Sequence, residues 1–170
     1  MGRAAVRSAI AAYLAPSNSS IAGLGNVYAH PARFTPEGDF YANDDPGNTD
    51  GAVVFLHLEH VSAKRRSLQG APAGGKQRKY TLVMDCFIRS TAPTTQECGA
   101  FADAFLDSLT AWIEADKNAG NAAVIFQWGE GERIGEPDLD TIATYPHPIG
   151  NAQNVSQVRA RITTTILEQT

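Results

Sequence analysis

The sequence lacks the features that mark several common classes of protein. Two cysteines in 170 residues exclude a small fold held together by disulfide bonds. Apolar runs stay well short of the ~20 residues that a membrane-spanning helix needs. Charged residues are 19% of the chain and apolar residues 43%, which excludes an intrinsically disordered protein. We expect Cys86 and Cys98 to be small buried apolar residues in a reducing compartment. A disulfide between them stays open but is not indicated.

The N-terminal residues also lack a targeting pattern. The apolar stretch around Arg3 and Arg7 is too short and too broken for a secretory signal. Val6 stands where a myristoylation motif carries serine or threonine. We therefore expect a protein that is not exported and has no membrane partner. The length favours one domain spanning residues 1–170.

The most regular stretch is a strand that leads into an amphipathic helix. From Tyr80 to Arg89 apolar side chains recur at every second residue, which predicts one buried strand face. The opposite face carries Val83 and Phe87 among polar residues, as expected where a sheet meets solvent or another molecule.

A helix is expected to begin after Pro93 and to end near Lys117. Thr94 and Glu97 have the spacing of a capping box, in which the threonine oxygen accepts a hydrogen bond from the third helical amide. The apolar stripe of this helix consists of Cys98, Phe101, Phe105, Leu109 and Trp112.

Weaker patterns complete the expected fold. They predict a short helix over 3–14, strands over 21–28, 52–62, 122–128 and 155–167, and a brief extended segment at 141–144. The sequence thus predicts an α+β fold, with a mostly antiparallel sheet of about four to five strands and two helices packed on one face.

Charge is segregated into two long loops, expected at 35–50 and 64–79. The first contains five acids and no base: Glu37, Asp39, Asp44, Asp45 and Asp50. The second contains six bases and no acid: Lys64, Arg65, Arg66, Lys76, Arg78 and Lys79. Since the whole chain has a net charge of -4, the remainder without these six bases carries -10. A connection this long exceeds an ordinary hairpin turn, so we expect a basic loop with an acidic partner, or else a solvated tip.

The motif closest to an enzyme signature is the glycine-rich segment 70–77, GAPAGGKQ. It resembles a nucleotide-binding P-loop up to its last position, where Gln77 replaces the serine or threonine that holds magnesium. A P-loop needs a helix after it, whereas the residues that follow alternate as a strand does. We interpret the segment as a flexible loop tip and keep a nucleotide-binding enzyme as the less favoured alternative.

No other pattern favours catalysis, a cofactor or a metal. His57 and Glu59 should point to one side of a strand and His60 to the other, so the three cannot share an ion unless a bulge intervenes. The acids of 35–50 lack the spacing of a calcium loop. Nucleic-acid binding is not favoured, because no aromatic residue lies among the bases of 64–79 to stack on a nucleobase.

The order of elements resembles the tail terminator, or tail completion, proteins of long-tailed bacteriophages. The resemblance lies in the N-terminal helix 3–14, the segment 21–28 (IAGLGNVY) followed by Pro31, and the long-looped pair of strands. The helix after Thr94 and the β-branched C-terminal strand complete it. Nearly the whole chain is covered, although the loops are longer than in the smallest such proteins.

The resemblance implies a structural virion protein that is assembled in the host cytoplasm and lies at the head-proximal end of the tail. Such a protein forms a homo-oligomeric ring, commonly of six copies, which caps the tail tube, ends its polymerisation and binds the neck proteins of the head-tail connection. Another head-tail connector or a minor tail subunit is the nearest alternative. No sequence-specific nucleic acid is implied.

A ring needs one side of each copy to complement the opposite side of the next. We expect the bases of 64–79 to contact the acids of 35–50 in a neighbouring copy, or an acidic surface of the tube or neck protein. Because exposed ion pairs contribute only ~0 to 1 kcal/mol each, the apolar surface at Val83 and Phe87 is expected to hold the ring together.

Overall fold

Three long strands form the centre of the molecule: β2 (Gly51–Arg65), β3 (Lys76–Ser90) and β7 (Ser156–Gln169). The structure is a computed structural model. It describes residues 2–32, 50–65, 76–91, 94–116, 118, 126–129, 137–144, 147–148 and 156–169. β3 is central and pairs antiparallel with β2 on one side and with β7 on the other.

Four shorter strands extend this sheet on both sides. β1 (Leu24–Tyr28) pairs in parallel with the first residues of β2. β4 (Phe126–Trp128), β5 (Asp140–Ala143) and β6 (His147–Pro148) pair antiparallel with β7 along its outer edge. The order is β1-β2-β3-β7-β4, with β5 and β6 also beside β7.

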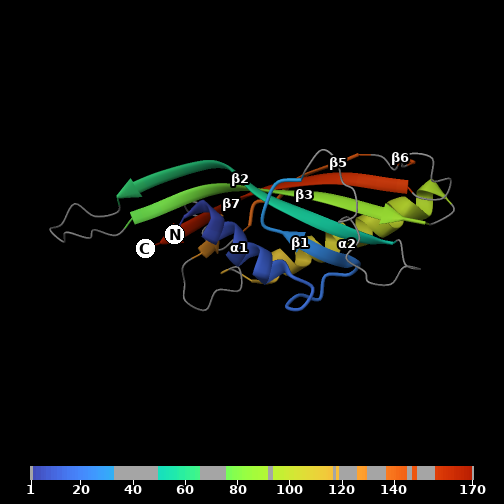
Figure 1. Cartoon of the computed structure of the whole chain (residues 1–170), viewed down its shortest axis with the longest axis horizontal. Coiled ribbons are helices and arrows are strands. Elements are labelled where there is room, and N and C mark those ends of the chain that lie inside the picture. Colours follow the sequence, from blue (N-terminus) through green and yellow to red (C-terminus); the bar gives the residue numbers. More distant parts are fainter. Residues whose placement is uncertain are drawn as a thin grey trace.

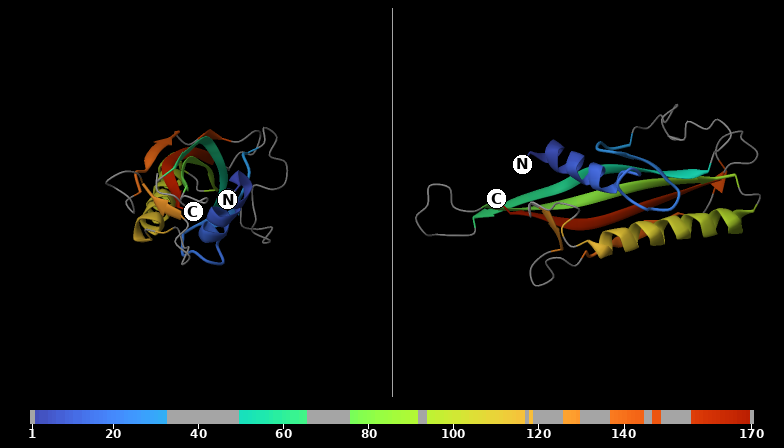
Figure 2. Two further views of the ribbon diagram at one scale, coloured as in Figure 1. Left: turned by 90° about the vertical axis from the view of Figure 1, so that its left-hand side faces the viewer. Right: turned by 90° about the horizontal axis from the view of Figure 1, so that it is seen from below.

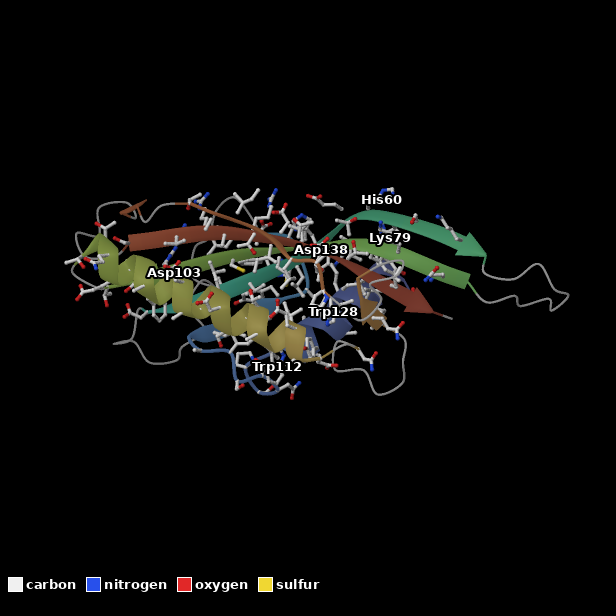
Figure 3. All side chains as sticks on the ribbon, turned by 180° about the vertical axis from the view of Figure 1, so that it is seen from behind. His60, Lys79, Asp103, Trp112, Trp128 and Asp138 are labelled. Carbon is white, nitrogen blue, oxygen red and sulfur yellow. The ribbon has the colours of Figure 1, made fainter. Side chains whose placement is uncertain are left out.

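The α+β class is confirmed, but the sheet differs from the expected one. Within the described residues it has seven strands rather than four or five, and it is mixed and curled rather than plainly antiparallel (Figure 2). The parallel pair arises because residues 29–50 separate β1 from β2, enough chain for the crossover that parallel strands require. The additional strands are too short for a period-two pattern to predict them.

Both helices, α1 (Arg3–Leu14) and α2 (Thr95–Ala115), pack on the same face of the sheet (Figures 1 and 2). We call this the helix face. The core there contains alternate residues of the three long strands, such as Leu56, Met84 and Ile162. The helices contribute Val6, Ile10, Tyr13, Leu14, Cys98, Ala102, Phe105, Leu109 and Ile113.

The predicted start of α2 is confirmed. Thr94 Oγ1 accepts a hydrogen bond from the amide of Glu97 at 3.2 Å, and it donates to Glu97 Oε2 at 2.8 Å. The predicted stripe is rotated slightly, because Phe101 and Trp112 are only partly buried whereas Ala102 and Ile113 are buried.

The expected loop at 64–79 is shorter than predicted, because β2 continues to Arg65 and β3 begins at Lys76. The paired ends of these strands, 61–65 and 76–79, project beyond both helices (Figure 1). We call them the arm. Of the predicted glycine-rich tip at 70–77, residues 70–75 lie outside the described residues, as does the acidic stretch 35–49. Residues 76–77 belong to β3 rather than to a loop.

Candidate interaction surfaces

The arm concentrates positive charge on a rigid projection of the sheet. Lys64 is exposed and pairs in register with Gln77, while Arg65 pairs with Lys76. Five bases and no acid occur among residues 61–65 and 76–79. Ladder hydrogen bonds pair the backbones of these strands, so the residues that carry the charges are held on an ordered part of the sheet.

A buried carboxylate anchors the base of the arm. Glu168 on β7 is fully buried on the helix face and accepts a 2.5 Å hydrogen bond from the hydroxyl of Tyr80. Arg78 Nη1 lies 3.5 Å from the same oxygen, Glu168 Oε2. Burial and this bond raise the pKa of Tyr80 to about 12. Burial by itself raises the pKa of Glu168, but hydrogen bonds and nearby positive charge lower it by more. The pKa of Glu168 is therefore lowered overall, and the side chain stays a carboxylate.

The opposite face of the sheet, which we call the second face, carries an aromatic cluster near the start of β2. Phe55 stacks on Tyr28 with ring centroids 4.9 Å apart, and it meets the ring of Phe87 edge-on at 5.7 Å. His30 lies 5.7 Å from Phe55. The guanidinium of Arg159 sits 5.4 Å from the centre of the Phe87 ring. This cluster joins β1, β2, β3 and β7 on one surface and leaves Phe87 half-buried.

A charge network adjoins the aromatic cluster. Arg161 Nε donates to Asp85 Oδ1 at 2.8 Å, and this contact raises the pKa of Arg161. His57 Nδ1 lies 3.4 Å from Asp85 Oδ2 without hydrogen-bond geometry, and His57 Nε2 lies 3.7 Å from Glu59. Burial, with a smaller effect from a neighbouring arginine, lowers the pKa of Arg89, whose Nε donates to a glutamine side chain at 3.0 Å.

The histidines lie differently from the prediction. β2 has an irregularity between Leu58 and His60, which shifts the register and pairs His60 with Thr81. His57 pairs with Val83, so both histidines fall on the second face. The bulge that would bring the two together is therefore present. Even so, within the described ranges no three His, Cys, Asp or Glu side chains are grouped to hold a metal ion.

The prediction that Val83 lies on a contact surface is wrong. Val83 is fully buried, because β3 is central and the short valine lies between its cross-strand neighbours His57 and Thr163. Phe87 remains a candidate, since it is half-buried on the same face. Asp50 is already engaged within the chain, where its carboxylate accepts bonds from the amide and the hydroxyl of Thr91.

The other predicted contact residues divide into two groups. Lys64, Arg78 and Lys79 lie on the arm, as do the backbones of Arg65 and Lys76. Residues outside the described part of the chain are Glu37, Asp39, Asp44, Asp45 and Arg66.

Sequence reasoning missed two features. The C-terminal strand was expected to end at residue 167, but its alternation continues beyond that point and buries Glu168 on the same face as Ile166. The segment around β5 was expected only as a brief extension. It carries Asp138 and Asp140, both exposed, and Ile142, whose 65% exposure makes it the most prominent exposed apolar residue of the described chain.

Comparisons with known proteins identify no family for this chain. A scan against protein-family models finds no match, and a search of curated proteins finds no significant match. Among the described helices, neither is both long and apolar enough to cross a membrane. The function has to be argued from the surfaces themselves.

Proposed function

We propose that this chain is a structural virion protein, a tail terminator that forms a six-copy ring, caps the tail tube and joins it to the neck proteins. The observation that carries the proposal is the arm. It places a row of positive charge on a rigid strand pair beyond the helices, on a body whose remaining charge is strongly negative. Such an arrangement suits binding to an acidic protein surface, including that of another copy.

The order of elements also supports the proposal. An N-terminal helix precedes a short strand, a long hairpin, a second helix and a long C-terminal strand, which is the order on which the resemblance rests. Both described helices cover one face of the sheet, and no described helix covers its second face, which we propose as a surface for partners.

The proposed ring contact differs from the one expected from the sequence, which used Val83 and the acids of 35–50. Val83 is buried and cannot provide apolar contact area, and Asp50 already binds Thr91. The apolar contribution would instead come from Phe87 and its neighbours on the second face.

Another head-tail connector or a minor tail subunit would use the same kind of surface. The position of the protein along the virion distinguishes these alternatives from a terminator. A nucleotide-binding enzyme is less well supported, because β3 begins at Lys76. A P-loop would need a helix there, so that helix-terminal amides point at the phosphates.

The test is to assemble the encoding virus without this chain. Tails of uncontrolled length that do not join heads, together with six-fold rings of the purified protein in electron micrographs, are the expected results. Restoring the protein should restore tail length and head joining. Tails of normal length joined to heads in its absence would refute the terminator role, and magnesium-dependent binding of ATP or GTP would favour the enzyme.

A further inference from the structure

The two lateral edges of the sheet carry opposite charge. One edge is the outer side of β2. β1 pairs with β2 only from Ala52 to Phe55, and no described strand continues beside it through His57 to Arg65. Backbone groups along such an edge can pair with another chain. This edge includes the exposed acid Glu59, but its charged residues on the arm, Lys64 and Arg65, are both basic.

The other edge is formed by β5, which pairs with β7 on its inner side. No described strand lies on its outer side. Residues 140–144 are all exposed, and the segment 137–144 contains Asp138 and Asp140 but no base. Ile142, on the same strand, exposes 65% of its surface and offers apolar contact area.

Charge determines which edges can meet. Two β2 edges would bring basic arms together, and two β5 edges would oppose their aspartates; like charges across strands destabilise pairing. A β2 edge against a β5 edge brings opposite charges together. This contact joins different surfaces of two copies, so it repeats head to tail and forms a ring if the rotation closes.

The two edges are also offset along the strands. Asp140 pairs with Thr163, which pairs with Val83, which in turn pairs with His57. Lys64 lies further along β2, towards the end of the arm. Neighbouring copies joined through these edges would therefore be staggered, as a sheet that closes on itself requires.

We propose that the outer edge of β2 on the arm of one copy docks against β5 of the next copy, with charge selecting the head-to-tail contact. This inference rests on the proposed function only in requiring that the chain assembles with itself. Exposed Lys64, which Arg65 follows in the sequence, marks the positive side, and the exposed residues Asp138 and Asp140 mark the negative side.

Charge-reversed pairs test the contact. One variant carries Lys64→Glu and Arg65→Glu, and the other carries Asp138→Lys and Asp140→Lys. Each alone should associate at least ~10-fold more weakly than the original protein, because two attractive pairs become repulsive. An equimolar mixture should recover assembly, since each interface then joins opposite charges again. Sedimentation velocity measures the size of the assemblies.

A matched control reverses two exposed acids on the outer side of α2, Asp103→Lys and Asp107→Lys, and should leave assembly unchanged. Circular dichroism checks that every variant is folded. Recovery in the mixture, to assemblies larger than dimers, supports the inference. Unchanged assembly of either folded variant, no recovery on mixing, or recovery that stops at dimers would overturn it.

The outcomes also separate this inference from the proposed function. If the original protein forms rings but the charge reversals have no effect, the edge contact is wrong and the ring remains. If the original protein stays monomeric at every concentration and salt level, self-assembly itself is refuted.

Discussion

Removal of one hydroxyl, by Tyr80→Phe, tests whether the buried carboxylate at the base of the arm is stabilised as the structure indicates. Tyr80 donates to Glu168, which is fully buried on β7. A hydrogen bond to a charged group contributes ~1.5 to 3 kcal/mol, about twice the value of a neutral one. For a chain of this length, a loss of ~2 kcal/mol lowers the melting temperature by roughly 4 to 8 °C.

The matched control is Tyr13→Phe, because the hydroxyl of Tyr13 donates to a neutral acceptor, the backbone carbonyl of Trp112, at 3.0 Å. Both tyrosines lie in the core. We expect the control to cost only ~0.5 to 1.5 kcal/mol. Urea unfolding followed by circular dichroism at neutral pH gives both values. Equal losses in the two variants would refute the proposed stabilisation of Glu168.

The pH dependence provides a second criterion. The pKa of Glu168 is lowered in the folded protein, so its contribution to stability is present above its ordinary pKa and is lost as the pH falls through the folded value. Tyr80→Phe removes part of that lowering, so the variant and the original protein should converge in acid. The raised pKa of Tyr80 affects the stability of the protein at alkaline pH. Its contribution is present below pH ~10 and is lost as the pH rises towards about 12, a loss that the variant should lack.

Three further perturbations address the fold. Thr94→Ala should cost about 1 kcal/mol of unfolding free energy in urea titrations, because α2 loses its N-cap oxygen; an unchanged value would contradict the capping assignment. Gly23→Ala should cost at least ~1 kcal/mol in the same assay, since Gly23 has φ 74° and an added Cβ would lie 3.0 Å from the Phe101 ring; wild-type stability would be inconsistent with that backbone. Cys86 and Cys98 should react with a thiol reagent only after unfolding, because both are buried and burial raises the pKa of each; rapid labelling of the native protein would show that they are accessible.

Periodicity predicted the elements that bury a continuous apolar face. The helix after Thr94 was expected with nearly its observed bounds, and the strand through Tyr80 was expected correctly except that β3 begins earlier, at Lys76. Burial of their apolar residues depends on a regular spacing, which the sequence shows. The short strands β4, β5 and β6 were only partly predicted. They pair along β7, and tertiary contacts rather than local pattern determine where they form.

The candidate surfaces were harder to predict for a related reason. Composition located the bases of 64–79 but gave no sign that most of them belong to long paired strands. The expectation for Val83 failed because alternation specifies which face a side chain occupies, not whether its neighbours cover that face. On β3, Val83 lies between two paired strands and is fully buried.

The length of the paired strands changes how the basic segment can act. A mobile loop would lose conformational entropy when it ordered on a partner, a cost of roughly 1 to 2 kcal/mol for each residue fixed. The strands of the arm have already incurred that cost in folding, through the ladder bonds and through the Tyr80–Glu168 contact at their base. A partner therefore meets a backbone that is already ordered, so weak exposed ion pairs can contribute to orientation at a lower entropic cost. For this reason we expect a variant that loses the Tyr80–Glu168 contact to assemble with itself more weakly.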